Sequence, residues 1–406
     1  MIVLAGGDIV LPDRILSNAS LIIDQGKIAA IDTARGTPAG ASVIDVQDSY
    51  VVPGFVDVHV HGVDGHDTLD GENAISAIAS RLPRYGVTAF CPTTVACGPR
   101  ELRTALDQIA AARVTRPVGA ARVLPAHLES NFINPEYKGA QPLGCLRLPN
   151  DERGDGEFSG REILDIIDAR AADVCIVTLA PEIEGALDLI PRLVRRGHRV
   201  SLGHSGADFD QSVAAIDAGA RHATHLFNRM TAMNHRAPGL AGAVLSHEEV
   251  TAELICDGFH VHPAMSRLAI AAKGADGVMA ITDATAGAGL DPGTMTRLGG
   301  RAIRVSDRAA LLEDGTLAGS TLTMDRAFRN IVTMFRASIT EAAILCSTTP
   351  ARALGLPRLG VIAAGNIADL VVLDRGFRVS RTLVDGEQIY ERAAHSAGPL
   401  PGHRAG

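Results

Sequence analysis

Six side chains that can bind a divalent metal ion stand at the ends of short apolar runs of this chain. Each run has the composition of a β-strand. The side chains that close the runs are His59, His61, Glu129, His204, His225 and Asp283. Side chains at the same end of several parallel strands converge on one pocket in a barrel. A divalent metal held there lowers the pKa of water to roughly 7 and so permits hydrolysis at neutral pH. The pattern therefore predicts a metal-dependent hydrolase.

His59 and His61 are separated by a single valine. Side chains two positions apart in a strand point to the same face of the sheet, so both imidazoles can reach one ion. A His-x-His pair taken alone is equally compatible with two hydrogen-bonded histidines near a strand end. Pro53-Gly54 before the strand and Gly62 after it favour the ligand interpretation.

The remaining members of the set come from four other runs. Glu129 closes an apolar run, and a carboxylate in that position is costly unless it is paired or bound to a metal. Taken singly, His204, His225 and Asp283 would each be interpreted as an ordinary hydrogen-bonded side chain. Together the set closes the first, third, fifth, sixth and eighth of the expected strands, which favours one shared site. His127 is expected outside the ligand set, because that set is already complete.

The elements that must position these side chains alternate between strands and amphipathic helices. Eight strands with helices between them, over about 230 residues, predict a (β/α)8 TIM barrel. The expected strands are Val51–His61, Val87–Thr93, Arg122–Glu129, Val174–Ala180, Arg199–Ser205, His222–Phe227, Thr251–Asp257 and Gly277–Ala284. Four histidines outside them are expected on the surface or in loops: His66, His198, His235 and His247.

Both chain ends carry short strand patterns with tight turns. Residues 20–32 have the pattern of a hairpin around Gln25-Gly26, and residues 362–392 have the same character. We expect the two ends to form one small β-sandwich domain from residues 1–52 and 360–393, with the barrel catalytic domain at 53–359.

Composition narrows the classes of partner. Hydrophobic residues make up 46% of the 406 residues, whereas aromatics make up 3% and Trp is absent, so the core must consist of Ala, Val, Leu and Ile. The net charge of -8 and the lack of a long basic run argue against nucleic acid and anionic membranes as partners. No signal peptide, membrane-length apolar run or Cys-x-x-Cys pair is present, which predicts a cytoplasmic protein with reduced thiols.

Several stretches, in order along nearly the whole chain, resemble the N-acetylglucosamine-6-phosphate deacetylase family of the amidohydrolase superfamily. They are residues 53–62, 127–129, 202–205, 223–228, 236–242, 257–260, 281–284 and 317–325. The resemblance implies a TIM barrel with a small β-sandwich from both termini. It also implies hydrolysis of the N-acetyl amide of N-acetylglucosamine 6-phosphate to glucosamine 6-phosphate and acetate.

The resemblance implies a role for each residue of the set. Glu129, His204 and His225 match the principal metal ligands, while His59 and His61 match those of a second ion present in some members. One or two divalent ions are therefore expected, with Zn first and Fe, Mn or Co as alternatives. Asp283 matches the catalytic acid/base, and it can accept the proton of water and pass it to the departing amine.

A further set matches substrate contacts of the family. It comprises Gln141, Asn228, Arg229, Arg236, His260, Ala318, Gly319 and Ser320. In the family the arginine at position 236 reaches across a dimer interface to the phosphate. The resemblance thus implies a homodimer with Arg236 near the interface, and a small N-acetyl amino sugar phosphate as the ligand.

The lysine count separates related chemistries. Hydantoinases and dihydroorotases bridge two metals with a carboxylated lysine after the fourth strand, but no lysine occurs here between Lys138 and Lys273. Glu129 must therefore bridge instead, which favours the deacetylase branch and weighs against ureases and phosphotriesterases.

Three positions depart from the family pattern. Ser130 and Asn131 replace a Gly-Pro pair, and Gln141 replaces a histidine. Two alternatives therefore stay open beside the leading hypothesis. One is the same deacetylase chemistry on a different N-acylated amino sugar or amine, phosphorylated or not. The other is a catalytically silent barrel that binds metal only.

Overall fold

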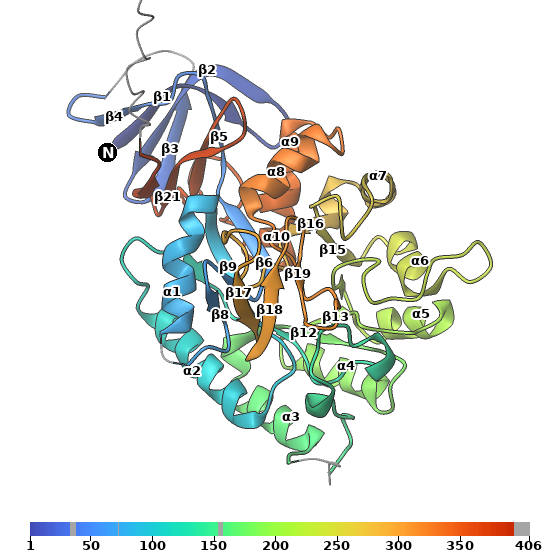
Figure 1. Ribbon diagram of the computed structural model, residues 1–406. Coiled ribbons are helices and arrows are strands. Elements are labelled where there is room, and N and C mark those ends of the chain that lie inside the picture. Colours follow the sequence, from blue (N-terminus) through green and yellow to red (C-terminus); the bar gives the residue numbers. More distant parts are fainter. Residues whose placement is uncertain (33–37, 72, 153–156, 394–406) are drawn as a thin grey trace, which may run out of the picture.

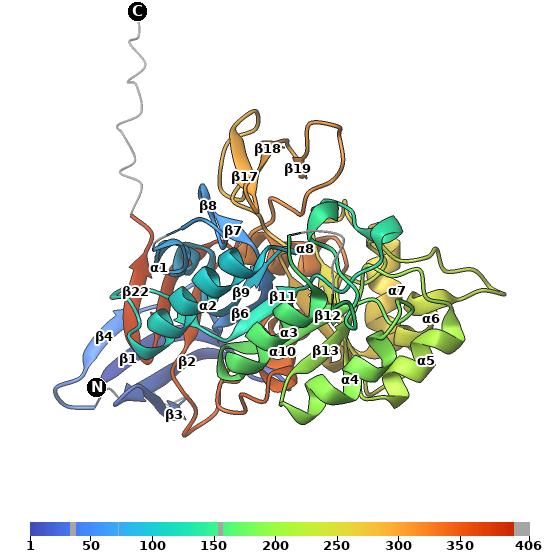
Figure 2. The same cartoon turned by 90° about the horizontal axis from the view of Figure 1, so that it is seen from below.

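The barrel and the β domain lie side by side in the computed structural model, which describes residues 1–32, 38–71, 73–152 and 157–393 (Figures 1 and 2). Neighbouring barrel strands are parallel throughout. A parallel bridge between Val60 and Ala284 joins the first strand to the segment after the last. The strands, in barrel order, are β6 (Phe55–Val60), β9 (Val87–Thr94), β10 (Arg122–Val123) with β11 (Ala126–Glu129), β12 (Val174–Leu179), β13 (Arg199–Leu202), β14 (His222–Ala223), β15 (Thr251–Ile255) and β16 (Val278–Ile281). The predicted fold class is confirmed.

Helices cover the outside of the barrel, so most strand residues are buried on both faces, as parallel sheets require. Helix α5 shows how the sequence sets a boundary, because Asp208 and Gln211 form a reciprocal capping box at its start. None of the helices in the described part of the chain is long and apolar enough to span a membrane. The helices are α1 (Ala74–Arg81), α2 (Pro99–Val114), α3 (Gly160–Ala169), α4 (Ala186–Arg195), α5 (Phe209–Asp217), α6 (Gly239–Ser246), α7 (Pro263–Lys273), α8 (Met324–Thr333), α9 (Ile339–Ala343) and α10 (Thr349–Ala353).

The two chain ends share one sheet, because β20 pairs antiparallel with β5. The predicted hairpin is present, with Gln25 and Gly26 at φ values of 47° and 76° between β2 and β3. Positive φ at both central positions is the geometry of a type I′ turn, which glycine and short polar residues favour. The exact residue bounds of the two domains stay a prediction. The strands are β1 (Ile2–Val10), β2 (Ile15–Asp24), β3 (Lys27–Asp32), β4 (Ser42–Asp45), β5 (Ser49–Pro53), β20 (Leu370–Asp374), β21 (Val379–Val384) and β22 (Glu387–Glu391).

The first expected barrel strand, Val51–His61, is two strands that belong to different sheets. β5 ends at Pro53 and β6 begins at Phe55. Gly54 separates them, and a Cβ at this position would lie 2.2 Å from Thr88 Oγ1. Only glycine fits there, so the chain passes from the β domain into the barrel at this residue.

Two further differences concern a small three-stranded sheet and a histidine. A three-stranded sheet, β17 (Met295–Leu298), β18 (Arg301–Val305) and β19 (Ala310–Leu311), was not expected and stands clear of the barrel in Figure 2. His198 lies in the loop before β13, one of the two expected places, but not at the surface. Its side chain is buried, and Nδ1 donates to the Val174 carbonyl at 2.9 Å.

Four charged side chains form a cluster between the barrel and the β domain, called the junction below: Arg116, Arg122, Asp369 and Asp385. Arg122 lies 2.9 Å from Asp385 and 3.4 Å from Asp369, and Arg116 lies 3.1 Å from Asp385. The Asp385 backbone N–H also donates to Asp369 at 2.8 Å. Burial raises the pKa of Asp369 to about 6, although Arg122 acts to lower it. Cations and anions alternate, so each charge of the junction faces one of opposite sign, although Arg122 Nε has no hydrogen-bond partner among the described atoms.

Candidate metal centre and substrate pocket

All six candidate ligand and catalytic side chains lie at the carboxyl ends of barrel strands. His59 and His61 come from the end of β6, and Glu129 is the last residue of β11. His204, His225 and Asp283 each follow a strand end, with φ values of 49°, 30° and 49°. Such left-handed backbone costs roughly 1–3 kcal/mol per residue and clusters at functional sites. The strand ends therefore hold these side chains in a conformation that regular structure would not give.

One oxygen of Glu129 faces two imidazoles. Oε1 lies 2.8 Å from His204 Nε2 and 2.9 Å from His225 Nε2, and the two ring nitrogens are 3.1 Å apart. All three side chains are buried. Their donor atoms lie close enough together to surround one ion.

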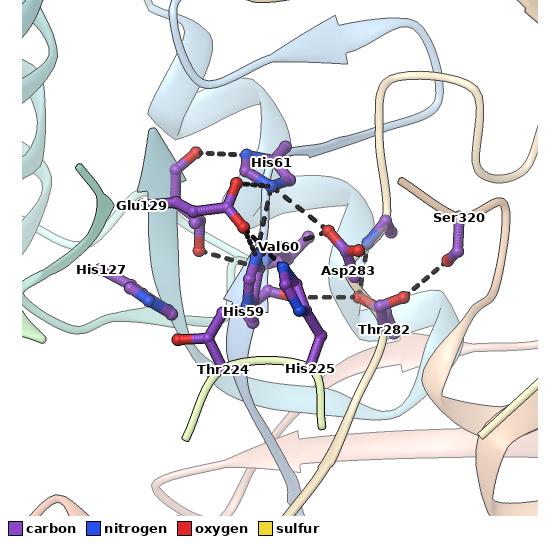
Figure 3. A network of polar contacts seen from close by, with 12 residues as sticks. His59, Val60, His61, His127, Glu129, Thr224, His225, Thr282, Asp283 and Ser320 are labelled. Carbon is purple, nitrogen blue, oxygen red and sulfur yellow. Dashed lines mark hydrogen bonds and ion pairs between the residues drawn. The ribbon is translucent and has the colours of Figure 1, made fainter. Parts of the chain in front are cut away.

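The second oxygen of the same carboxylate faces His61, one member of the other histidine pair. Glu129 Oε2 lies 3.5 Å from His61 Nε2, and the Nε2 atoms of His59 and His61 are 3.3 Å apart. Asp283 Oδ1 lies 3.4 Å from His59 Nε2 and 3.3 Å from His61 Nε2. Figure 3 shows these side chains converging around the Glu129 carboxylate. Glu129 is thus shared between two groups of possible ligands.

In His59, His61 and His204 the hydrogen bond made by Nδ1 leaves the lone pair of the neutral ring on Nε2. Nδ1 of His59 donates to a carboxylate at 2.8 Å, and Nδ1 of His61 and His204 donate to backbone carbonyls at 3.2 and 2.8 Å. When these rings are neutral, their Nε2 lone pairs point at one another and at carboxylate oxygens, which is repulsive unless a cation lies between them. Tetrahedral ligands at about 2.0–2.1 Å from zinc would be about 3.3–3.4 Å apart. The spacings of 3.3–3.5 Å in the His59–His61 half agree with that value, whereas those of 2.8–3.1 Å between Glu129, His204 and His225 are shorter. The residues fit one or two divalent ions.

The pKa directions reflect the same crowding. Burial alone would raise the pKa of Glu129, but His204 and His225 outweigh it and hold the pKa well below its usual range. Burial lowers the pKa of His59 to about 4. For His225 burial acts in that direction too, yet Glu129 raises the pKa to about 9. In this cluster, burial and the neighbouring charges therefore shift the pKa values in opposite directions.

A pocket of about 430 Å³ opens onto these side chains. Arg229 lines it without a carboxylate partner among the described residues. Eight lining residues were not foreseen: Glu136, Tyr137, Gly139, Ala140, Phe227, Met230, Leu298 and Leu317. Ten predicted residues line it: His61, Glu129, Gln141, His204, His225, Asn228, Arg229, His260, Asp283 and Gly319.

Other predicted residues lie outside the pocket lining. Arg236 is exposed on the segment between β14 and α6, and Ala318 and Ser320 are buried. Ser320 supports the site from behind, because its N–H donates to the Asp283 carbonyl at 2.8 Å and its hydroxyl to the Thr282 carbonyl at 2.6 Å. His127 points away from the Glu129 carboxylate in Figure 3, and its Nε2 contacts a threonine hydroxyl.

Two of the pocket side chains are held by neighbours. Gln141 Oε1 accepts a hydrogen bond from the Ala96 N–H at 2.7 Å, and its Nε2 donates to Glu129. His260 Nδ1 lies 2.6 Å from Asp257 Oδ2, while its Nε2 has no partner among the described atoms. The orientation of Gln141 is therefore fixed by the protein, whereas the free nitrogen of His260 is available to a ligand.

Two buried carboxylates beneath the site were missed by the sequence reasoning. Asp57 lies in β6 and Glu253 in β15, and both are fully buried. Each is an acid inside an otherwise apolar strand, and that signal could have drawn attention to them. Burial raises the pKa of both groups to about 7.

Comparison with known proteins gives consistent relatives. A profile of the amidohydrolase family matches residues 50–389. The chain is 36% identical to the N-acetylglucosamine-6-phosphate deacetylase of Bacillus subtilis, over 93% of this chain and 94% of that one. It is 37% identical to the N-acetylgalactosamine-6-phosphate deacetylase of Escherichia coli O157:H7, over 92% and 95%. An N-acetylglucosamine-6-phosphate deacetylase variant of Mycobacterium smegmatis, in complex with N-acetyl-D-glucosamine-6-phosphate, matches with a TM-score of 0.87, 33% identity and coverage of 96% and 99%.

Proposed function

The chain belongs to the amidohydrolase family, in the branch that holds the N-acetylglucosamine-6-phosphate deacetylases, and we propose that it hydrolyses the N-acetyl amide of N-acetylglucosamine 6-phosphate. The products are glucosamine 6-phosphate and acetate. The observation that carries this proposal is the Glu129 carboxylate shared by two histidine pairs, with Asp283 beside it in the pocket wall.

We assign the ligand role to His59, His61, Glu129, His204 and His225. When bound, a divalent ion activates water and polarises the amide carbonyl. Zn²⁺ is our first choice, because imidazole and carboxylate are its usual ligands, and Fe, Mn and Co are the alternatives.

Asp283 is the proton carrier of the proposed reaction. Burial raises the pKa of Asp283, but His59 and His61 outweigh that effect and hold the pKa below its usual value. The carboxylate is therefore ionised near neutral pH. It accepts a proton from the attacking water as the new C–O bond forms, and gives that proton to the amine nitrogen as the C–N bond breaks. Such transfer contributes roughly 10²–10⁴-fold to the rate.

Two arginines account for recognition of an anionic substrate. Arg229 lines the pocket of its own chain, whereas Arg236 is exposed and does not. We propose that Arg236 completes the pocket of a second copy in a homodimer, as the family resemblance implies. A guanidinium fork suits a phosphate group. Asn228, Gln141, His260 and the segment 318–320 would then fix the sugar and the acetamide.

A second candidate substrate is a different amino sugar phosphate, of which N-acetylgalactosamine 6-phosphate is the first to test. Two observations favour it: the similarity to the Escherichia coli protein with that printed activity and the altered loop after Glu129. There Asn131 Nδ2 donates to the Cys97 and Cys145 carbonyls at 2.8 and 2.7 Å, which joins two loops beside the pocket. These two hydrogen bonds depend on Asn131, which departs from the family pattern, so the loops beside the pocket are held differently in this chain.

Acetate release from a zinc-loaded, purified protein tests the proposal. The substrates are N-acetylglucosamine 6-phosphate, N-acetylgalactosamine 6-phosphate and unphosphorylated N-acetylglucosamine. We expect turnover of a phosphorylated sugar, with kcat/KM lower by roughly 10–100-fold when the charged group is missing. Absence of acetate from all three substrates would overturn the function. Preference for the galactose isomer would select the second candidate.

We also propose a cytoplasmic location. All six cysteines are free thiols in the structure, and reduced cysteines are typical of cytosolic proteins. Light scattering of the purified protein tests the homodimer. Arg236→Ala should leave the dimer intact while raising KM for the phosphorylated substrate.

A further inference from the structure

Glu253 lies inside the barrel beneath the proposed ligands. It is the third residue of β15, and its side chain is fully buried. Burial of a carboxylate costs free energy unless the group has a partner that depends on it. The contacts of its two oxygens show what that partner is.

One oxygen of Glu253 makes all of its close contacts. Oε2 accepts a hydrogen bond from His59 Nδ1 at 2.8 Å, and the His225 backbone N–H lies 3.3 Å from the same atom. Oε1 has no hydrogen-bond partner among the described atoms. The next group is His127 Nδ1 at 3.7 Å, which instead donates to the Val58 carbonyl at 2.9 Å. The carboxylate is therefore committed to the His59 ring.

His59 is distinguished by this partner. The Nδ1 atoms of His61 and His204 donate to neutral backbone carbonyls. A carboxylate partner fixes the tautomer and the ring plane and also raises the basicity of the opposite nitrogen. That nitrogen, His59 Nε2, faces His61 at 3.3 Å and Asp283 at 3.4 Å. The effect is thus directed to one half of the metal centre.

We propose that Glu253 is a positioning residue that sets the affinity of the His59–His61 half of the centre for its ion. The inference rests on the proposed ligand roles of both histidine pairs and takes each half of the centre to hold one ion. In this proposal Glu253 determines whether one or two ions bind, although it is not itself a ligand of either ion. The Glu129–His204–His225 half keeps its own ligands and depends on Glu253 only through the longer backbone contact of His225.

Asp57 supplies a matched control for Glu253. It is equally buried and also contacts His59, but through the backbone N–H at 3.3 Å rather than through the ring. Its second oxygen accepts a hydrogen bond from the Thr282 hydroxyl at 2.6 Å. Removing the Asp57 charge therefore tests burial and proximity without changing the imidazole partner.

The experiment measures zinc per chain and zinc affinity, in buffers that fix free Zn²⁺, for the wild type, Glu253→Ala, Glu253→Gln and Asp57→Asn. We expect two ions in the wild type and in the Asp57 variant. We expect Glu253→Ala to bind one ion normally and the other roughly 10–100-fold more weakly. Glu253→Gln keeps the shape but not the charge and should show a smaller loss in the same direction. If the alanine variant does not fold, the glutamine variant decides.

A double variant separates positioning from general support. With His59→Ala already present, the further change Glu253→Gln should leave zinc binding unchanged, because the coupled group is gone. Unchanged binding of both ions in the Glu253 single variants would overturn the inference, as would equal weakening of both ions. If the wild type binds two ions but releases no acetate, the proposed function is contradicted and the inference is not, since zinc binding is measured without substrate.

Discussion

The metal centre is a buried ionic cluster and the junction a partly exposed one, and the two have opposite internal organisation. In the junction, Arg122 lies between Asp369 and Asp385, so each charge faces one of opposite sign. In the metal centre, ring nitrogens and carboxylate oxygens face one another at 2.8–3.5 Å. Buried polar groups in proteins are normally satisfied by their neighbours. A cluster whose lone pairs converge is therefore built for a cation, whereas a self-complementary cluster is built to hold two units together.

The largest expected effect comes from Glu129→Gln, which removes the charge shared by both halves of the centre. Loss of the ions removes several kcal/mol of transition-state stabilisation, so the rate should fall by roughly 10³-fold or more. Metal analysis and acetate release measure the two consequences. A thermal midpoint equal to that of the metal-free wild type is the control, because loss of bound ions by itself lowers the midpoint. A variant that retained both ions and its rate would contradict the shared-ligand geometry.

Asp283→Asn should separate chemistry from metal binding. The asparagine keeps the size of the side chain but cannot accept a proton, so kcat should fall by roughly 10²–10⁴-fold. The metal content should stay close to that of the wild type, because the five assigned ligands remain. Acetate release and metal analysis on the same sample give both values. Normal turnover by this variant would remove Asp283 from the mechanism.

Arg122→Met tests the other side of the comparison. The methionine keeps much of the packing of the arginine stem but leaves Asp369 without its cation. Breaking a buried pair in this way costs about 3 kcal/mol, near the lower end of the usual range, because Arg122 is partly exposed. Urea unfolding at pH 8 measures the change. We expect kcat of the folded variant to match the wild type. A fall in kcat without loss of stability would contradict the assignment of the junction to stability and of the metal centre to catalysis.

The smallest expected effect is a dependence of stability on pH at Asp369. Its folded pKa of about 6 lies above its ordinary 3.8, so between these values the folded chain binds more protons than the unfolded chain. Asp369 therefore makes the stability fall as the pH rises from about 4 to about 6, by about 2–3 kcal/mol. Asp369→Asn lacks this contribution and should become more stable relative to the wild type over that range. Parallel stability curves for the two proteins would contradict the raised pKa.

The sequence allowed the candidate ligands to be grouped for a topological reason. In a parallel barrel, residues that close successive strands must meet at one end, so Glu129, His204 and His225 could be grouped before their distances were known. The left-handed φ values of His204, His225 and Asp283 could not be predicted in this way. They follow from the turn that each strand makes into its loop.

What the sequence did not reveal depends on contacts between distant segments. Gly54 divides two sheets because Thr88 leaves no room for a side chain, and that neighbour is invisible in a local pattern. Glu253 looked like one polar position in a strand, since its partner His59 lies far away along the chain. The sheet β17–β19 had a local signal, the Gly299-Gly300 pair with positive φ at both residues, that was not used.

The pairing of β5 with β20 has a consequence for how the protein is made. Ser49 lies opposite Asp374 in this ladder, so the first sheet stays incomplete until almost the whole polypeptide has left the ribosome. The edge of β5 that pairs with β20 therefore stays unpaired while the intervening barrel is synthesised. Truncation shortly before residue 370 would therefore expose β5 and favour aggregation of nascent chains, although every assigned ligand would already be present.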